Sequence, residues 1–225
     1  MKKFYRADEP SQSAFPIEKA GFPFIFMAGF STAVFALIGV KSLAVFGLFL
    51  TLFICFFFRD PDRVIPEKEN SVVSPADGKV IFIDHVEENP FLEEDCLKIS
   101  IFMSVFNVHV NRVPFSGIVK KIKYSPGKFF NASYDKASRD NEHNAVIVQT
   151  ESGIKYCMVQ IAGLIARRII CKIQEDEQIE KGSRFGLICF GSRLDIYLPP
   201  NTDINVSIGE KVSAGTSILG YLRKS

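Results

Sequence analysis

The sequence lacks the residue patterns that mark metal-binding and disulfide-stabilised domains. Its cysteines form no Cys-x-x-Cys pair and have no metal-ligand spacing, so we expect reduced packing thiols and no metal site; the five are Cys55, Cys96, Cys157, Cys171 and Cys189. The sequence also lacks an excess of either charge, because 27 basic residues against 25 acidic ones leave a net charge of +2. A nearly neutral chain carries no electrostatic signature of bulk nucleic-acid binding, and we expect no nucleic-acid partner.

Charge is almost absent from residues 22–58, where Lys41 is the one charged side chain among eleven phenylalanines. A single helix of this length would measure ~55 Å, whereas the hydrocarbon core of a bilayer is ~30 Å thick. Two helices, Phe22–Val40 and Ser42–Phe58, would span ~28 Å and ~26 Å and would move Lys41 to the far interface. We therefore predict an N-terminal transmembrane α-hairpin. The alternative is a buried core hairpin of a soluble protein, although few soluble cores contain so long an apolar stretch with so few polar residues.

A hairpin places both ends of the chain on one side of the membrane, and basic residues indicate which side. Positive side chains next to a membrane span favour the cytoplasm, and here they are Lys2, Lys3, Arg6 and Lys19 before the run and Arg59 and Arg63 after it. We therefore expect a protein of the cell membrane with three parts. Residues 1–21 form a cytoplasmic N-terminal segment, residues 22–58 the membrane hairpin, and residues 59–225 a cytoplasmic domain.

The part of the chain after the hairpin has the pattern of a mainly β domain. Short runs in which apolar and polar residues alternate are separated by glycine and proline; examples are Lys79–Asp84, Leu97–Phe102, Ile118–Lys123 and Ala145–Val148. A single short helix is predicted around residues 163–168. We expect a compact β-sandwich or barrel.

Two stretches of this domain, residues 74–80 and 209–215, resemble each other loosely. They are similar to the paired hammerhead halves of biotinyl and lipoyl domains, and two ordinary hairpin turns are the alternative. No Met-Lys-Met attachment site is present, and Asp77-Gly78-Lys79 does not match the tip of a carrier hairpin. A carrier role therefore does not fit the sequence.

Two residues stand out as candidates for chemistry. Ser192 lies in the apolar, strand-like stretch FGSRLDIYLP, and His109 lies among apolar and β-branched residues in FNVHVNRVP. On the residues alone, Ser192 reads as a serine at a strand edge or turn. His109 is either a core histidine whose ring nitrogens have hydrogen-bond partners or a general base with a pKa near neutrality. Asp77 could orient that base as the third member of a triad.

Seven motifs in order resemble the short form of the phosphatidylserine decarboxylase proenzymes. They are FFRDPDR, SPADGKV, FNVHVNRVP, YSPGKFFNA, QIAGLIARRI, RFGLICFGSRLDIYLP and VSAGTSILG. The resemblance implies that the bond between Gly191 and Ser192 cuts itself, giving residues 1–191 (β chain) and 192–225 (α chain), and that Ser192 becomes a covalent pyruvoyl group, the cofactor. It also implies a triad of Asp77, His109 and Ser192.

Self-cleavage sets chemical requirements that the implied residues can be compared with. The serine hydroxyl is a weak nucleophile and needs a base, which would be His109. The Gly191 carbonyl needs hydrogen-bond donors for its oxyanion, and glycine lets the backbone be approached without a Cβ. The larger members of the family carry a second histidine where this chain has Arg112. Either His109 serves both cleavage and decarboxylation, or another group protonates the product.

The resemblance further implies a membrane-associated lyase that decarboxylates phosphatidylserine to phosphatidylethanolamine and CO2. The amine of the phospholipid would form a Schiff base with the pyruvoyl group, which acts as the electron sink. Arg167 and Arg168 would bind the phosphodiester, or form a solvated basic pair. The expected partners are the lipid, the membrane and the chain's own two fragments as a heterodimer, and self-association into a homo-oligomer is left open.

Two other functions remain as alternatives. One is a membrane-anchored serine hydrolase that uses Ser192, His109 and Asp77, although residues 190–194 are not a Gly-x-Ser-x-Gly elbow. The other is a non-catalytic, lipoyl-like membrane adaptor.

Overall fold

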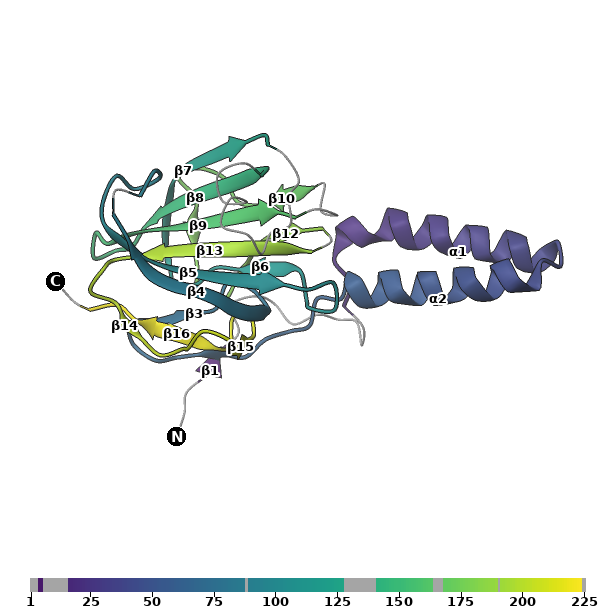
Figure 1. Cartoon of the computed structure of the whole chain (residues 1–225), viewed down its shortest axis with the longest axis horizontal. Helices are drawn as coiled ribbons and strands as arrows, with labels where there is room; N and C mark the ends of the chain where they lie inside the picture. The colour runs from purple at the N-terminus through teal and green to yellow at the C-terminus, as the bar shows by residue number, and fades with distance from the viewer. Residues whose placement is uncertain are drawn as a thin grey trace. The chain divides into compact units, whose positions relative to one another are not determined.

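The structure is a computed structural model that describes the backbone of residues 4–5 and residues 16–87, 89–127, 141–163, 168–189 and 191–223. The chain forms two compact units. The first comprises residues 10–62 and contains the helices, and the second comprises residues 1–9 and 63–225 and contains the strands. Figure 1 shows both units with their elements labelled.

Two antiparallel helices, α1 (Phe22–Leu37) and α2 (Lys41–Phe57), occupy the apolar run after a 3-10 turn, η1 (Lys19–Gly21). Gly39, with φ +79°, forms the reversal between them, so Lys41 is the first residue of α2 at the tip of the hairpin. Small residues allow the helices to approach: a Cβ on Gly47 would lie 2.5 Å from Thr32 Oγ1. Thr32 and Thr51 contact each other through their hydroxyls at 3.4 Å. Such small-residue contacts are typical of helix pairs in membranes.

The segment Lys19–Leu37 is long and apolar enough to cross a membrane, and α2 is a shorter apolar helix. No residue of α1 is buried, and large side chains project from both helices, with Phe26 72%, Phe49 67% and Leu37 86% exposed. Exposed apolar surface of this extent marks a lipid or protein contact. The alternative of a buried core hairpin is therefore not supported for α1.

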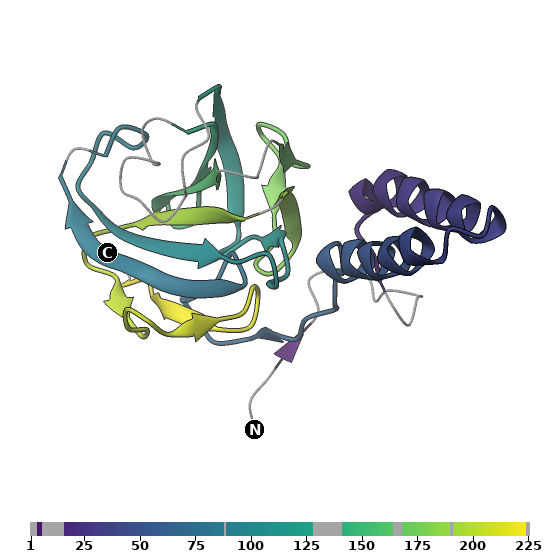
Figure 2. The same ribbon diagram turned by 45° about the vertical axis from the view of Figure 1, so that its right-hand side comes forward.

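The β unit is built around one curled, antiparallel sheet of eight strands in the order β11-β7-β8-β9-β13-β5-β4-β15 (Figures 1 and 2). Two three-stranded sheets, β10-β12-β6 and β14-β16-β3, and a strand pair, β1-β2, accompany it. The strands are β1 (Phe4–Tyr5), β2 (Ile65–Pro66), β3 (Ser71–Val73), β4 (Gly78–Val86), β5 (Cys96–Met103), β6 (Val110–Arg112), β7 (Gly117–Ser125), β8 (His143–Gln149), β9 (Lys155–Ala162), β10 (Ile169–Cys171), β11 (Gln178–Ile179), β12 (Arg184–Ile188), β13 (Ser192–Leu198), β14 (Asp203–Ile204), β15 (Lys211–Val212) and β16 (Ile218–Tyr221).

The prediction of a mainly β domain is confirmed. The four alternating runs named from the sequence fall within β4, β5, β7 and β8. The short helix predicted around residues 163–168 lies mostly at 164–167, outside the described residues. The charged neighbours of His143 in Asp-Asn-Glu-His-Asn are typical of a solvated loop, but the residue begins β8, is half-buried and packs edge-on against Phe91.

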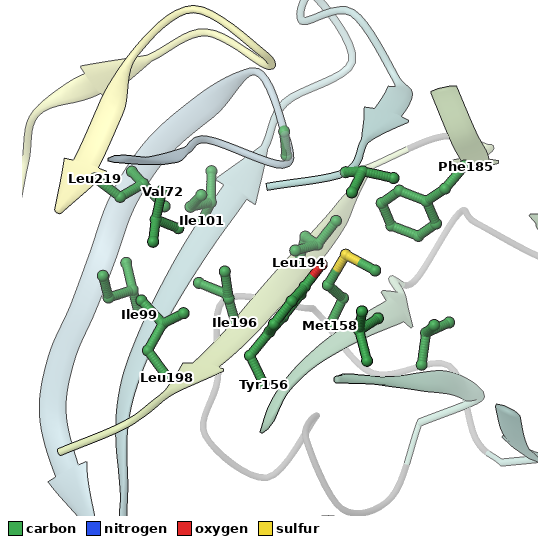
Figure 3. Close-up of a cluster of buried hydrophobic side chains, with 14 of the residues drawn as sticks. Val72, Ile99, Ile101, Tyr156, Met158, Phe185, Leu194, Ile196, Leu198 and Leu219 are labelled. Carbon is green, nitrogen blue, oxygen red and sulfur yellow. The ribbon is translucent and has the colours of Figure 1, made fainter. Parts of the chain in front are cut away.

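Strand β13 separates two apolar clusters because its side chains alternate between the two faces of the sheet. Leu194, Ile196 and Leu198 point into the main core, together with Met158 of β9 and Ile101 of β5 (Figure 3). These apolar residues stand at every second position of β13, which explains why the stretch after Gly191 has the pattern of a strand in the sequence.

The opposite face of β13 carries a buried group of charges. The side chain of Arg193 pairs with Asp195 at 2.8 Å, and Asp195 also accepts an ion pair from Lys98 of β5 at 3.2 Å. Buried charges are tolerated only when paired in this way. The second contact links β13 to β5 through side chains as well as backbone.

The two similar stretches noted in the sequence meet in the structure. Lys211 and Val212 of β15 pair with Lys79 and Gly78 of β4. The carboxylate of Asp77 accepts a hydrogen bond from the backbone N–H of Ala214 at 2.7 Å. The hammerhead assignment itself stays a prediction.

The burial of β13 yields a prediction about stability. Replacing the fully buried Ile196 by alanine should lower the free energy of unfolding by about 2–5 kcal/mol, because it removes apolar contacts and leaves a cavity. The matched control is Ile208→Ala, since Ile208 is 63% exposed and its loss should change stability by less than about 0.5 kcal/mol. Urea unfolding of the full chain in detergent micelles measures both, and equal losses would contradict the assigned core.

Candidate functional site

The candidate site lies at the start of β13, where the chain changes from a turn into the centre of the sheet. Ser192 is fully buried and is the first residue of the strand. It pairs with Met103 of β5 on one side and with Ala162 of β9 on the other. A backbone held on both edges fixes the position of the residue that opens the strand.

The residue before the serine has a conformation that favours glycine. Gly191 has φ +64°, in the left-handed region that other residues rarely adopt. No described atom lies within 4 Å of the position that a Cβ would take there. The Gly191–Ser192 bond therefore joins a left-handed turn to a fixed strand. Phe190 lies outside the described residues.

The hydroxyl of Ser192 has an unusual partner. It donates to the thioether sulfur of Met103 at 3.5 Å. The side-chain amide of Asn111 donates to the same sulfur at 3.7 Å. A thioether is a weak acceptor, so the hydroxyl is oriented without being held strongly.

Asn111 belongs to a row of buried carboxamides. Gln160 Nε2 donates to Asn111 Oδ1 at 3.0 Å, and Asn144 Nδ2 donates to Gln160 Oε1 at 3.2 Å. All three side chains are buried, and they come from β6, β9 and β8. Buried polar groups that satisfy one another in this way fix a single arrangement of the core.

His109 immediately precedes β6 and is fully buried. Its Nδ1 lies 3.0 Å from the carbonyl oxygen of Asn107. Because a carbonyl only accepts, Nδ1 donates in this contact, and Nε2 is the nitrogen that carries the lone pair whenever the ring is neutral. The side chain of Asn107 also accepts hydrogen bonds from the N–H and hydroxyl of Ser104, at 2.9 and 2.7 Å. The loop from Met103 to His109 is thereby fixed at both ends.

Asp77 lies in the turn before β4, where its carboxylate joins distant segments. It accepts a hydrogen bond from Ala214 N–H and forms an ion pair with Arg63 at 2.9 Å. The same turn reaches β6, because the carbonyl of Pro75 accepts the N–H of Arg112 at 2.9 Å. Arg112 itself is buried and donates from its guanidinium to the carbonyl of Gly182 at 2.7 Å.

The structure describes one of the two arginines that the sequence suggests for phosphate binding. Arg167 lies outside the described residues. Arg168 is exposed, and its carbonyl accepts the N–H of Cys189 at 3.1 Å. Arg168 thus lies beside the strand end that leads to Gly191. Among the described residues, no group of three or more His, Cys, Asp or Glu could hold a metal ion.

Comparison with known proteins identifies the family. The phosphatidylserine decarboxylase family model matches residues 50–220. Phosphatidylserine decarboxylase proenzymes of Geotalea uraniireducens and Syntrophus aciditrophicus are 52% and 53% identical to this chain, covering 92% and 91% of it and 97% and 96% of their own lengths. The proenzyme of Desulfotalea psychrophila is 47% identical over 94% of this chain and 99% of its own length.

The chain belongs to the phosphatidylserine decarboxylase family. It is therefore a decarboxylase, a lyase of phospholipid metabolism. The resemblance drawn from the seven motifs is confirmed.

Three residues of this candidate site were not found from the sequence: Met103, Asn111 and Gln160. One available signal was the position of Asn111, two residues after His109 in the same motif. Gln160 lies 49 residues from Asn111, and its signal was its position at the start of the motif QIAGLIARRI.

Burial makes two of the cysteines, Cys96 and Cys157, weak nucleophiles. Burial raises the pKa of the Cys96 thiol to about 11, and it raises the pKa of the Cys157 thiol still further. The thiolate is the reactive form, so both thiols are inert near neutral pH.

This inertness can be tested by alkylation of the native protein. A maleimide at pH 7.5 should leave Cys96 and Cys157 unmodified, because a thiol whose pKa is raised stays protonated until the pH approaches that pKa. Mass spectrometry of peptides locates the label, and denatured protein serves as the control in which all five cysteines react. Rapid native labelling of Cys96 would contradict the burial.

Proposed function

We propose that this chain is a proenzyme that cleaves its own backbone between Gly191 and Ser192 and then decarboxylates phosphatidylserine to phosphatidylethanolamine and CO2. One observation carries the proposal: a buried serine opens the central strand directly after a glycine with φ +64°. The printed names of the relatives, phosphatidylserine decarboxylase proenzymes, agree with processing of a precursor.

Self-cleavage uses the chain's own groups. Ser192 Oγ attacks the Gly191 carbonyl, and His109 Nε2, which holds the lone pair, accepts the hydroxyl proton. The peptide bond becomes an ester of Gly191 on Oγ. The imidazole gives its proton to the nitrogen of Ser192 as the C–N bond breaks. Loss of the Cα proton and of the Gly191 carboxylate then leaves dehydroalanine at position 192, and water replaces its nitrogen, releasing ammonia. The glycine allows this attack because no Cβ blocks the carbonyl.

The surroundings of Ser192 suit a pyruvoyl group, which is about as large as the serine it replaces. Met103 and Ala162 flank the position and are fully buried, so water has little access from the core side. When present, the group would supply an electron sink for the electron pair left as CO2 departs from the substrate. No metal is needed for this chemistry.

Other residues of the chain would bind the substrate and move protons. Arg168 is exposed beside the strand end that leads to Gly191, and with Arg167 it would pair with the lipid phosphodiester. His109 would return a proton to the product carbon, since the second histidine of larger family members is replaced by the buried Arg112. Asp77 would position His109 through the main chain. The carbonyl of Pro75, in the same turn as Asp77, accepts a hydrogen bond from the N–H of Arg112, which lies on the strand that follows His109.

The hairpin would anchor the enzyme next to its substrate. The apolar faces of α1 and α2 suit the lipid interior, and the basic residues that flank them favour a cytoplasmic catalytic domain. A headgroup could then react without its lipid leaving the bilayer. After cleavage, residues 1–191 and 192–225 would remain together as a heterodimer.

Neither alternative function gains support. The chain lacks the Gly-x-Ser-x-Gly elbow that a serine hydrolase would need. The family model that matches it is that of a decarboxylase and not that of a hydrolase. An adaptor would not belong to a family of decarboxylases.

The decisive variant is Ser192→Ala. We expect it to release no CO2 from vesicles that contain phosphatidylserine labelled at the serine carboxyl, because no ketone can form without the hydroxyl. The matched control is Ser183→Ala in the second Gly-Ser pair, where Gly182 also has positive φ but the half-exposed Ser183 donates to the Glu180 carbonyl. The control should retain full activity, and turnover by Ser192→Ala at the rate of the unmodified enzyme would refute the proposal.

The roles of His109 and Asp77 are tested by following processing rather than turnover. His109→Ala and Asp77→Ala should both leave the precursor uncut on denaturing gels, because the first removes the base and the second releases the turn that supports it. His85→Ala is the control, since His85 is exposed on β4. Normal cleavage in either test variant would remove that residue from the cleavage role.

A further inference from the structure

Three buried carboxamides lead to the reacting serine in a fixed direction. Asn144 donates to Gln160, Gln160 donates to Asn111, and Asn111 donates to the sulfur that also accepts the Ser192 hydroxyl. We call Asn144, Gln160 and Asn111 the amide relay. All of its side chains are buried, with exposed fractions of 3%, 0% and 0%.

The direction of the relay determines which end of Asn111 faces Ser192. A carboxamide carries donors on its nitrogen and acceptors on its oxygen. Because Asn144 occupies the oxygen of Gln160, the nitrogen of Gln160 faces Asn111 and occupies that oxygen in turn. The remaining end of Asn111 is its N–H donor, and it points at Met103.

The packing of two sheets maintains this arrangement. Asn111 lies on β6 of the small sheet, whereas Gln160 and Asn144 form a directly opposed pair on β9 and β8 of the large one. Gly186 of β12 makes room for the contact, since a Cβ there would lie 2.8 Å from Gln160 Nε2. The absence of a side chain at Gly186 therefore leaves space for the relay.

A donor at this position is suited to stabilise negative charge on Ser192 Oγ. In the precursor the amide and the hydroxyl share one weak acceptor, the Met103 sulfur. When charge develops on the oxygen, the amide gains a far stronger partner than the thioether. A buried, preorganised donor contributes most in such a low-dielectric site.

We propose that Asn111 stabilises the departing oxygen in the elimination step of self-cleavage, with Gln160 and Asn144 as positioning residues. This rests on the proposed self-cleaving function. In that step the Cβ–Oγ bond of residue 192 breaks, and its electron pair goes to Oγ, which leaves as part of the Gly191 carboxylate. The Cα proton of residue 192 passes to the imidazole of His109, and the Cα=Cβ double bond of dehydroalanine forms. Asn111 donates its N–H to the oxygen as the charge appears.

The test separates this step from the earlier attack of the hydroxyl. In Asn111→Leu, which preserves size but removes the donor, the ester should form and then persist, with elimination about 100-fold slower. Hydroxylamine cleaves an ester and leaves a peptide bond intact. Treatment of the variant should therefore release a C-terminal fragment that begins with intact serine, heavier than the pyruvoyl fragment by the mass of one ammonia.

Two further variants distinguish a positioning role from a general loss of packing. Gln160→Met leaves the Asn111 carboxamide free to flip, so that its N–H no longer always faces Met103. Elimination should therefore slow about tenfold, as expected for the loss of one buried hydrogen bond. The double variant should be no slower than Asn111→Leu alone, because Gln160 acts only through Asn111. Val110→Ala is the packing control, since Val110 is a buried neighbour of Asn111 without polar atoms, and it should accumulate no ester.

Each outcome either supports or overturns the proposed role of Asn111. Accumulated ester in Asn111→Leu and Gln160→Met supports the proposal. Complete processing at the rate of the unmodified enzyme, or an uncut precursor that hydroxylamine does not cleave, overturns it. Should Asn111→Leu fail to give a cooperative thermal transition, Gln160→Met decides by the same two readouts. If the unmodified chain itself never yields a pyruvoyl fragment, the proposed function fails instead.

Discussion

The hydrogen bonds that hold β13 on both of its edges are the constraint on which the rest of the structure depends. Ser192 is the first residue inside this strand, with Met103 and Ala162 as its neighbours. Gly191 lies just outside it in a left-handed turn. A peptide bond at such a junction has one rigid partner and one adaptable partner. The serine can therefore be presented in a fixed position while the preceding carbonyl turns toward its hydroxyl.

The same constraint would keep the product together. After a cut before Ser192, β13 would belong to a new chain of 34 residues but would keep its pairing with β5 and β9. The buried ion pair between Asp195 and Lys98 would then join the two fragments. Since separation of the fragments would break this buried contact, the ion pair opposes dissociation. Cleavage would change the covalent structure and leave the fold in place.

The sequence predicted the elements well where local patterns decide them. Alternating residues identify β4, β5, β7 and β8, and the long apolar run identifies the hairpin. It predicted His109 and Ser192 as candidates because they lie in motifs of one family. It could not predict the contacts that arise only when distant segments meet, such as the Asp77 carboxylate on Ala214, 137 residues away, or the Gln160 amide on Asn111. The position of His143 could not be predicted for a related reason: its charged neighbours are typical of a loop, whereas its packing against Phe91 is a tertiary contact.

The central claim is that residue 192 is a serine in the precursor and a ketone in the active enzyme. The most direct measurement is the intact mass, under denaturing conditions, of the purified protein that carries activity. The account predicts two fragments, of which the smaller contains residues 192–225 and is lighter than its sequence by one ammonia. Fully active protein that gives a single uncut mass, or a fragment with an unmodified serine at its start, would contradict it.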